Sequence, residues 1–550
     1  MRRAGVKLLR AGLYRASVQE NAMRGPGGID FTLGAPLSDV PEGGVLQGRV
    51  GDQSVLAFRE GGEVSVVSAK CTHYGAPLAK GLVGDGVVRC PWHHACFDLR
   101  TGEALRAPAF DSLNTWQVEV AGDWFFVREP HPQRHLAKPM PRQGEPKRIV
   151  IVGGGAAAFA AAEMLRRLGF GGALTMLSAD AAPPCDRPNL SKDYLAGTAA
   201  EEWISLKSDN FYAEHAIELK LGAEVTAIDL EKRDAITVSG ERHGFDALLL
   251  ATGAEPVRLS SPGFDLPNVY TLRSLADARA ITAAAERAKT VAVIGASFIG
   301  LEVAASLRAR GLDVHVIAPD AVPMERVLGR QIGAYIRNLH EAHGVRFHLR
   351  QKAERFDGRR LALSNGRSLD ADFVVLGVGV RPRADLALSA GLAVDNGIIV
   401  DRYFETSAKG VFAAGDVARY PDPRSSELIR VEHWVAAERQ GQAAASNLLG
   451  AETPFSGVPY FWSNHYGHAI RYAGHAPDWD AVDIDGTAAA GDCTFLYYLD
   501  RRLLAACSIG RDLENLKLER LIEQDCEGAL ADLMRRRSTQ GMESASAGER

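Results

Sequence analysis

Hydrophobic and polar positions follow two different patterns along the chain, and the change falls near residue 147. Before it, short apolar runs such as SVLAF (54–58) and EVSVVSA (63–69) are separated by glycines and turn residues. Runs of this length between turns are typical of β-strands, and WQVEVAGDWFFV (116–127) predicts a hairpin around Gly122. The first part of the chain is therefore predicted to be a small all-β domain.

After residue 147 the pattern becomes strand, glycine-rich turn and alanine-rich helix. The unit KRIVIVGGGAAAFAAAEMLRRLG (147–169) recurs as TVAVIGASFIGLEVAASLRARG (290–311). In such units the glycines let the backbone approach a pyrophosphate, whose charge is stabilised at the helix N-terminus. Two units at this separation indicate two dinucleotide-binding domains rather than a short-period repeat.

The composition is that of a soluble protein with several buried cores. The 550 residues allow three or four domains, and they are 46% hydrophobic and 24% charged. A formal charge of −5 favours neither nucleic acid nor an anionic membrane as a partner. No apolar run approaches the roughly 18 residues of a membrane span.

The seven cysteines do not have the spacing of a secreted disulfide framework, which favours a reducing cytoplasm. The basic N-terminal stretch MRRAGVKLLRAGLYRAS could be an organelle transit peptide or a disordered extension. We favour the extension.

Two short segments carry metal-binding chemistry. Cys71-x-His73 and Cys90-x-x-His93 are separated by sixteen residues, and each gives one thiolate and one imidazole. A Rieske [2Fe–2S] cluster requires this set, with cysteines on one iron and histidines on the other. The alternative is a zinc site with the same ligands, although small zinc folds usually pair cysteine with cysteine and histidine with histidine. Residues 31–130 resemble the Rieske iron–sulfur domains.

The resemblance has one local departure. His94 stands where the Rieske motif commonly has glycine, which questions the turn geometry but not the ligands. Cys96 has no counterpart in the ligand set and is expected to pack as a small apolar residue. Ala76 and Trp92 occupy the positions of the extra cysteines that form a disulfide in some members. The chain thus resembles the soluble, lower-potential type.

The first glycine loop follows the strand RIVIV and opens a helix, as the dinucleotide fingerprint requires. Its candidate cofactor-binding positions are Gly153, Gly155 and Ala158. The next strand, ALTMLS, ends near Asp180, a candidate for the adenosine ribose. The alternative for Asp180 is a plain surface carboxylate.

In the second loop the corresponding positions are Gly295, Ser297 and Gly300. Its companion strand places Ala318 where an acidic residue would mark a preference for NAD over NADP. The choice between NADH and NADPH therefore stays open, although Asp320 could still reach the ribose.

Further segments resemble those of the flavoprotein reductases with two dinucleotide-binding domains. The matching residues are Ala251-Thr252-Gly253, Gly379 and Gly415-Asp416. In that family the first and last segments close the FAD site and the Gly379 segment ends the nicotinamide domain. Cys185 stands alone where disulfide reductases carry a redox-active pair, which argues against dithiol chemistry.

The stretch DRPNLSK (186–192) narrows the resemblance to oxygenase-type ferredoxin reductases and the apoptosis-inducing-factor group. In these families the motif lysine, here Lys192, lies beside the flavin and pairs with the glutamate after the second loop, here Glu302. A cation near flavin N5 stabilises negative charge on the reduced ring; the alternative is an ordinary surface salt bridge. The other positions that match the flavin site are Arg187, Glu432, His433, Trp434 and Trp462.

The whole chain is thus identified as a Rieske domain fused to a ferredoxin-reductase-like flavoprotein, an arrangement that resembles apoptosis-inducing-factor-like proteins. We predict an all-β Rieske domain, an α/β flavoprotein with two dinucleotide-binding domains, and a small α+β C-terminal domain. The expected boundaries are a disordered extension (1–30), the Rieske domain (31–131), a linker (132–146), the FAD-binding domain (147–268 and 397–452), the NAD(P)-binding domain (269–396), the C-terminal domain (453–536) and a tail (537–550).

The resemblance implies an electron chain. NAD(P)H would deliver hydride to flavin N5, and the flavin would pass electrons singly to the Rieske cluster and on to an acceptor such as an oxygenase. An NADH-sensing interaction protein, or direct reduction of a small molecule at the flavin, are the alternatives. We expect FAD, NAD(P)H and a [2Fe–2S] cluster as cofactors, no nucleic-acid or membrane partner, and a monomer or homodimer.

Overall fold

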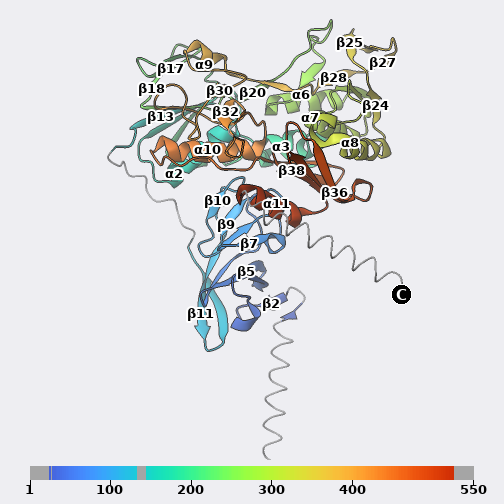
Figure 1. The fold of residues 1–550 in the computed structure, drawn as a ribbon. Coiled ribbons are helices and arrows are strands. Elements are labelled where there is room, and N and C mark those ends of the chain that lie inside the picture. The colour runs from blue at the N-terminus through green and yellow to red at the C-terminus, as the bar shows by residue number, and fades with distance from the viewer. Residues whose placement is uncertain (1–23, 26–27, 133–143, 426, 525–550) are drawn as a thin grey trace, which may run out of the picture. The chain divides into compact units, whose positions relative to one another are not determined.

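The computed structural model describes residues 24–25, 28–132, 144–425 and 427–524. The chain divides into two compact units, residues 1–135 and 136–550, and each is described by itself (Figure 1). No helix in the described ranges has the length and apolarity that crossing a membrane requires. Residues 133–143 of the predicted linker and the whole predicted tail lie outside the described residues.

Ordered structure begins earlier than the predicted boundary at residue 31. Residues 1–23 and 26–27 of the predicted extension lie outside the description, but Arg24–Gly25 (β1) and Gly28–Asp30 (β2) are strands. β2 pairs in parallel with β4 (Val45–Val50), and Asp30 forms an ion pair of 2.9 Å with Arg49. The correction arises because this strand depends on a partner later in the chain.

The first unit consists of two sheets, as the all-β prediction required. The larger sheet runs β1, β2, β4, β5 (Gln53–Glu60), β6 (Glu63–Ser68), β11 (Thr115–Ala121), β12 (Trp124–Pro130), β3 (Ala35–Pro36). The smaller runs β10 (Ala104–Arg106), β9 (Cys96–Asp98), β8 (Val87–Arg89), β7 (Leu82–Gly84). Two 3₁₀ turns, Leu37–Asp39 and Leu78–Lys80, connect strands. The hairpin predicted around Gly122 is β11–β12.

The second unit begins with a parallel five-stranded sheet. Its order is β15 (Ile217–Lys220), β14 (Ala173–Leu177), β13 (Arg148–Val152), β19 (Ala247–Leu250), β31 (Val411–Ala413). β13 and β19 are almost wholly buried, as expected of parallel strands covered on both faces. Helices α2 (Ala156–Arg167) and α10 (Trp434–Leu448) pack together. Their close approach needs Gly441, where a Cβ would lie 2.2 Å from the carbonyl oxygen of Ala157.

A second parallel sheet repeats this architecture. Its order is β21 (Val269–Thr271), β28 (Phe373–Leu376), β22 (Thr290–Ile294), β23 (Asp313–Ala318), β24 (Arg346–Leu349). Its helices are α6 (Leu275–Ala285), α7 (Phe298–Ala309) and α8 (Glu325–Ala342). Each parallel sheet is accompanied by a small antiparallel one: β16 (Val225–Asp229), β17 (Asp234–Thr237), β18 (Arg242–Gly244); and β25 (Ala353–Phe356), β26 (Arg360–Leu363), β27 (Ser368–Asp370).

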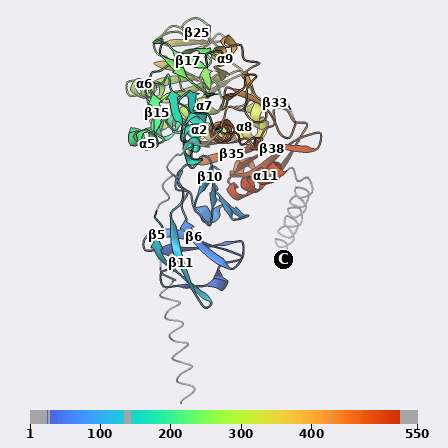
Figure 2. The same ribbon diagram turned by 90° about the vertical axis from the view of Figure 1, so that its left-hand side faces the viewer.

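The C-terminal part is an antiparallel sheet with one helix, the predicted α+β arrangement. The sheet runs β34 (Tyr460–His465), β35 (His468–Gly474), β38 (Arg502–Ile509), β37 (Asp492–Leu499), β36 (Ala481–Thr487). Helix α11 (Asp512–Gln524) packs on β35 and β38 (Figure 2). The remaining short elements are α3 (Arg187–Leu190), α4 (Asp193–Ala196), 3₁₀ turn Glu201–Trp203, α5 (Asp209–Glu214), β20 (Ala254–Pro256), β29 (Val380–Pro382), α9 (Asp385–Ser389), β30 (Ile398–Ile399), β32 (Ala418–Pro421), β33 (Leu428–Ile429) and 3₁₀ turn Ala488–Ala490.

Candidate functional site

The two predicted metal-binding loops have the same backbone design. In the first, the amide of Cys71 donates to the carbonyl of Ala76, and the amide of Gly75 donates back to the carbonyl of Cys71. In the second, Cys90 donates to Ala95, and His94 donates to Cys90. Each loop thus places its cysteine at the start of the same hydrogen-bonded turn.

This repetition shows which backbone position the unexpected histidine occupies. Gly75 and His94 occupy equivalent positions in the two turns, and both have left-handed backbone, with φ of +74° and +59°. Glycine is favoured there because it has no Cβ, so His94 is the departure that the sequence indicated. Its side chain is fully buried, and Cys96 is buried as the first residue of β9.

The four candidate ligands meet at the ends of these loops. The buried Cys71 and Cys90 thiols form a hydrogen bond, and this contact and burial raise the pKa of Cys71 above its usual range. The Nδ1 atoms of His73 and His93 lie 3.1 Å apart. Burial lowers the pKa of His73 to about 3, which keeps the imidazole in the neutral form that binds metal.

The donor set therefore separates into a sulfur pair and a nitrogen pair. Among residues 28–132, 144–425 and 427–524, no group of three or more His, Cys, Asp or Glu side chains could hold a single metal ion. A four-ligand zinc site needs such convergence, whereas a two-iron cluster takes two protein ligands on each iron. The sulfur pair and the nitrogen pair fit the two irons of the cluster.

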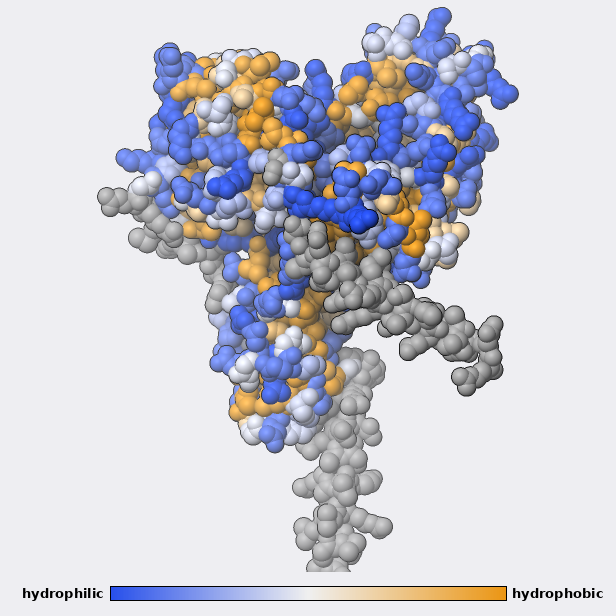
Figure 3. All heavy atoms as spheres, viewed as in Figure 1, coloured by the Kyte–Doolittle hydropathy of each residue, from blue (hydrophilic) through white to orange (hydrophobic). Residues whose placement is uncertain are grey.

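The second unit contains a cavity of about 1310 Å³ lined by segments from all three of its parts. The cavity extends from both glycine loops to β16, α9 and the start of β34. Figure 3 shows the notch between the two lobes of this unit, with hydrophilic side chains on both sides. A single cavity that touches both loops can bring two dinucleotides together.

The first loop is built for close approach and for negative charge. A Cβ at Gly153 would lie 2.2 Å from the carbonyl oxygen of Ala251, and a Cβ at Gly155 would lie 3.4 Å from Nη1 of Arg187. Arg187 pairs with Asp180 at 3.2 Å and Arg273 pairs with Asp416 at 2.6 Å. Burial and the charge of Arg273 lower the pKa of Arg187.

These two arginines lie on the cavity wall together with the N-terminus of α2. Nε of Arg273 is buried and has no hydrogen-bond partner among the described residues. A pyrophosphate bound to the loop would supply the missing acceptor and would balance the two guanidinium charges. The residues present therefore fit FAD.

The second loop packs in the same manner. A Cβ at Gly295 would lie 2.1 Å from the carbonyl oxygen of Gly377, and a Cβ at Gly300 would lie 2.2 Å from that of Gly295. Gly295 and Gly300 do not line the cavity, and neither does the fully buried Ala158. The absence of a side chain at Gly295 and Gly300 lets the loop, helix and strand approach closely, and Ser297 lines the cavity.

The other predicted positions lie on the cavity wall. These are Asp180, Arg187, Lys192, Ala251, Thr252, Gly253, Glu302, Gly379, Gly415, Asp416, Glu432, His433, Trp434 and Trp462. Ala318 is buried at the end of β23, and Asp320 forms an ion pair of 3.2 Å with Arg326. Arg326 lines the cavity, so a cation rather than an acid faces it from this segment.

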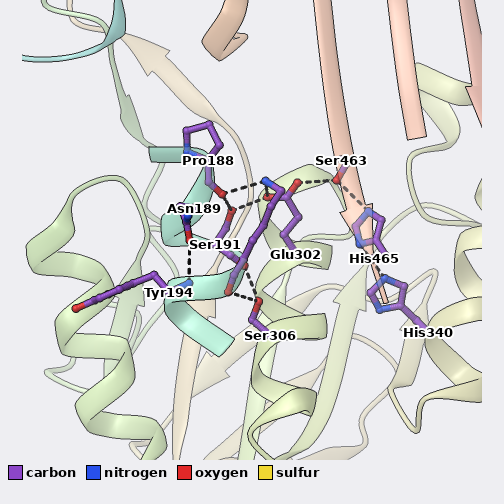
Figure 4. Close-up of polar contacts among 10 residues, drawn as sticks. Pro188, Asn189, Ser191, Tyr194, Glu302, Ser306, His340, Ser463 and His465 are labelled. Carbon is purple, nitrogen blue, oxygen red and sulfur yellow. Dashed lines mark hydrogen bonds and ion pairs between the residues drawn. The ribbon is translucent and has the colours of Figure 1, made fainter. Parts of the chain in front are cut away.

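Lys192 and Glu302 form the most buried charge pair on this wall. Nζ of Lys192 lies 2.8 Å from Oε2 of Glu302, and the side chains are 17% and 3% exposed. Figure 4 shows Glu302 held from both sides, since Ser191 donates to Oε2 at 2.5 Å and Ser463 donates to Oε1 at 2.6 Å. Lys192 is thereby fixed 6.0 Å from the centre of the Trp462 ring.

Several wall residues carry no recognisable motif. Phe461 stacks on His433 with ring centres 4.3 Å apart, and Phe298 meets Phe461 edge-on at 4.5 Å. Burial lowers the pKa of His433 to about 4. Phe298 stands inside the second glycine loop and Phe461 directly precedes the predicted Trp462, so both could have been found from the sequence, whereas Arg273 reaches the cavity only through the tertiary fold.

Comparison with known proteins agrees with this geometry. The chain matches the models of the pyridine nucleotide-disulphide oxidoreductase family over residues 147–441, the Rieske [2Fe-2S] domain over 31–117 and the reductase C-terminal domain over 460–538. Apoptosis-inducing factor 3 of Homo sapiens is 32% identical over 494 residues, which cover 86% of this chain and 81% of that protein.

Two further relatives match the reductase region. The ferredoxin–NAD(+) reductase subunit of the benzene 1,2-dioxygenase system of Pseudomonas putida is 34% identical, covering 68% of this chain and 92% of its own. The covalent putidaredoxin reductase–putidaredoxin complex contains a chain with a TM-score of 0.66 and 30% identity, covering 69% of this chain and 93% of that one. The cofactors are accordingly FAD, NAD(P)H and a [2Fe–2S] cluster. This chain therefore belongs to the pyridine nucleotide-disulphide oxidoreductase family, as a flavoprotein reductase that carries its own Rieske domain.

Proposed function

We propose that this protein oxidises NAD(P)H at FAD and passes the electrons one at a time through its own Rieske cluster to a protein acceptor such as an oxygenase. The observation that carries the proposal is the buried Lys192–Glu302 pair on the wall of a cavity that touches both glycine loops. A reductase needs both dinucleotides in one cavity and a fixed cation where negative charge develops.

When bound, FAD accepts a hydride and yields single electrons, and a Rieske cluster takes them at a higher potential than an all-cysteine cluster. The chain's own residues supply the setting. Arg187, Arg273 and the N-terminus of α2 would bind the pyrophosphate, and Lys192 presents a positive charge that Glu302 holds in place. His73 and His93 would hold one iron of the cluster through their nitrogen pair.

The nature of the acceptor follows from the domain combination. The benzene dioxygenase relative is named as a ferredoxin–NAD(+) reductase subunit. In the present protein a Rieske domain lies in the same polypeptide as the reductase. We infer that the internal cluster takes the place of a separate ferredoxin. The acceptor of its electrons is then the protein that such a ferredoxin would reduce. Nothing in the net charge of −5 favours nucleic acid. A cytoplasmic monomer or homodimer, with Cys71, His73, Cys90 and His93 as ligands, completes the proposal.

Anaerobic stopped-flow mixing with NADH and with NADPH tests the proposal. Flavin bleaching followed by reduction of the cluster, seen as a Rieske EPR signal in freeze-quenched samples, is the expected result. A cluster that stays oxidised while the flavin bleaches would contradict the internal chain and would favour direct reduction of a small molecule. The His93→Cys variant is the matched control, because it should keep flavin bleaching and lose the Rieske signal.

A second function is favoured by one observation. The match to apoptosis-inducing factor 3 extends over 86% of this chain, well beyond the 68% covered by the reductase relative. An NADH-sensing interaction protein is therefore the second candidate. A long-wavelength absorbance band that persists for minutes with negligible turnover would identify this function in the same experiment.

A further inference from the structure

Hydrogen bonds continue from Glu302 away from the cavity. Ser463 donates to Oε1 of Glu302 at 2.6 Å, and Nε2 of His465 lies 3.0 Å from the Ser463 hydroxyl. Nδ1 of His465 lies 3.3 Å from Nε2 of His340, and Nδ1 of His340 lies 3.4 Å from the Tyr466 hydroxyl. Figure 4 shows Glu302, Ser463, His465 and His340 in this order, each turned toward the next.

The middle of this series is closed to solvent and its far end is open. Ser463, His465 and His340 are each 0% exposed. Tyr466 is half-buried in the turn between β34 and β35, and its ring stacks at 3.7 Å on the exposed His343 at the end of α8. The series therefore runs from the cavity wall to the protein surface through the interior.

One arrangement of protons satisfies every contact when both imidazoles are neutral. Because the Ser463 hydroxyl donates to Glu302, it must accept from Nε2–H of His465. His465 then accepts at Nδ1 from Nε2–H of His340, which accepts at its own Nδ1 from the Tyr466 hydroxyl. All donors point in one direction, from the surface toward Glu302.

The surrounding charges keep the imidazoles neutral. Burial, with the charge of Lys192, lowers the pKa of His465 to about 3. Burial, with His465 and His343, lowers the pKa of His340 to about 2. Arg308 is the charged group that acts on Tyr466 from α7. A neutral imidazole is both donor and acceptor, which is what a group must be to pass a proton along.

We propose that Glu302, Ser463, His465, His340 and Tyr466 form a proton relay that connects the Lys192–Glu302 pair with solvent. The inference rests on the proposed function, because it assigns the relay to the charge changes of that site. Hydride transfer from NADH adds one negative charge to the site, and one proton moving inward to Glu302 compensates it. The ammonium of Lys192 is then left to face the added charge.

The proton count closes over one turnover. Two one-electron acceptors and one NADH give NAD⁺, two reduced acceptors and one proton. When the two electrons leave, the compensating proton returns outward along the relay, whose hydrogen bonds have reversed direction after the inward transfer. The one proton released per turnover is the hydrogen that NADH transferred as hydride. Ser463, His465, His340 and Tyr466 are positioning residues, since none of them needs to touch the substrate.

The resting arrangement can be tested without turnover. In the full-length protein labelled with ¹⁵N-histidine, His340 and His465 are expected to be neutral Nε2–H tautomers at pH 7. Ser463→Ala should shift the His465 Nε2 resonance, because that N–H loses its acceptor. An Nδ1–H tautomer or an imidazolium at either residue would overturn the relay.

Proton movement is followed by anaerobic stopped-flow mixing with NADH in weakly buffered solution containing a pH indicator. Ser463→Ala and His340→Phe should slow proton uptake about tenfold or more, the low end for a positioned acid–base group, while NADH affinity stays within about threefold. His348→Phe is the matched control, because His348 belongs to a separate pair with His315, with nitrogens 2.8 Å apart. Tyr466→Phe removes one hydroxyl only and serves if a buried substitution prevents folding.

The outcomes separate the two proposals. If NADH bleaches the flavin and all variants take up protons at the wild-type rate, the relay is wrong and the reductase function stands. If NADH does not bleach the wild-type flavin, the proposed function fails, and the NMR tautomers still decide the arrangement of the relay. A slower uptake in His348→Phe equal to that in Ser463→Ala would also refute the relay.

Discussion

Replacing Glu302 by glutamine removes one charge from the cavity wall and keeps the shape of the side chain. At the observed Nζ–Oε2 separation of 2.8 Å, two unit charges attract by about 6 kcal/mol at an effective dielectric constant of about 20. Taking the two groups out of water costs several kcal/mol and offsets most of this. The expected net coupling between Lys192 and Glu302 is about 2 kcal/mol, within the range for hydrogen bonds to charged groups.

A double-mutant cycle measures this coupling. Glu302→Gln, Lys192→Met and the double variant would be unfolded in urea with FAD bound, followed by FAD release and by far-ultraviolet circular dichroism. Each single variant should lose stability, Lys192→Met more so because it leaves the Glu302 carboxylate, 3% exposed, without its counter-ion, whereas the Lys192 ammonium left by Glu302→Gln is 17% exposed. The double variant should recover about 2 kcal/mol of the summed losses. A coupling below about 0.5 kcal/mol would refute the reasoning, since exposed pairs already reach that value.

Three other predictions follow from the described geometry. In the first unit, His93→Cys should move the EPR spectrum away from Rieske values, whereas His94→Gly should leave it largely intact; loss of the cluster in His94→Gly would show that the ligand assignment is wrong. Gly441→Val places a side chain 2.2 Å from a carbonyl of α2 and should cost at least about 3 kcal/mol by overpacking, with loss of FAD on desalting as the measurement. The pKa of His433 is lowered to about 4, so the unfolded chain binds the extra proton between about pH 6.5 and 4. His433 should therefore contribute a fall in stability of up to about 1.4 kcal/mol per pH unit as pH decreases through this window, and His433→Phe should reduce the slope of the urea-midpoint profile there by up to that amount.

The elements with strong local signals were predictable from the sequence. The run RIVIV predicted β13 because apolar β-branched residues favour a buried parallel strand. The predicted fold class is confirmed. It was predictable because each glycine loop lies directly between a strand and a helix in the sequence. Lys192 and Glu302 were paired through the family resemblance, and the structure brings them within 2.8 Å.

The remaining features depend on long-range packing that no local pattern encodes. Arg273 reaches Asp416 across 143 positions, and His340 reaches His465 across 125. The backbone contacts that exclude a side chain at Gly295 and Gly300 are also set by the tertiary fold, because they are made with Gly377 and within the loop itself. Gly28–Asp30 appeared to belong to an unstructured extension because a three-residue strand has no periodicity of its own.

The carboxylate of Glu302 also holds three parts of the second unit together. It belongs to α7, and it is held by Ser191 and Lys192 from the segment after the first glycine loop and by Ser463 from the C-terminal sheet. Three parts of the chain that could each be a folding unit thus share one buried side chain. We expect calorimetry to show residues 147–524 melting in a single cooperative transition, and grafting of any one part from another reductase to preserve that transition only when all three contacts are kept.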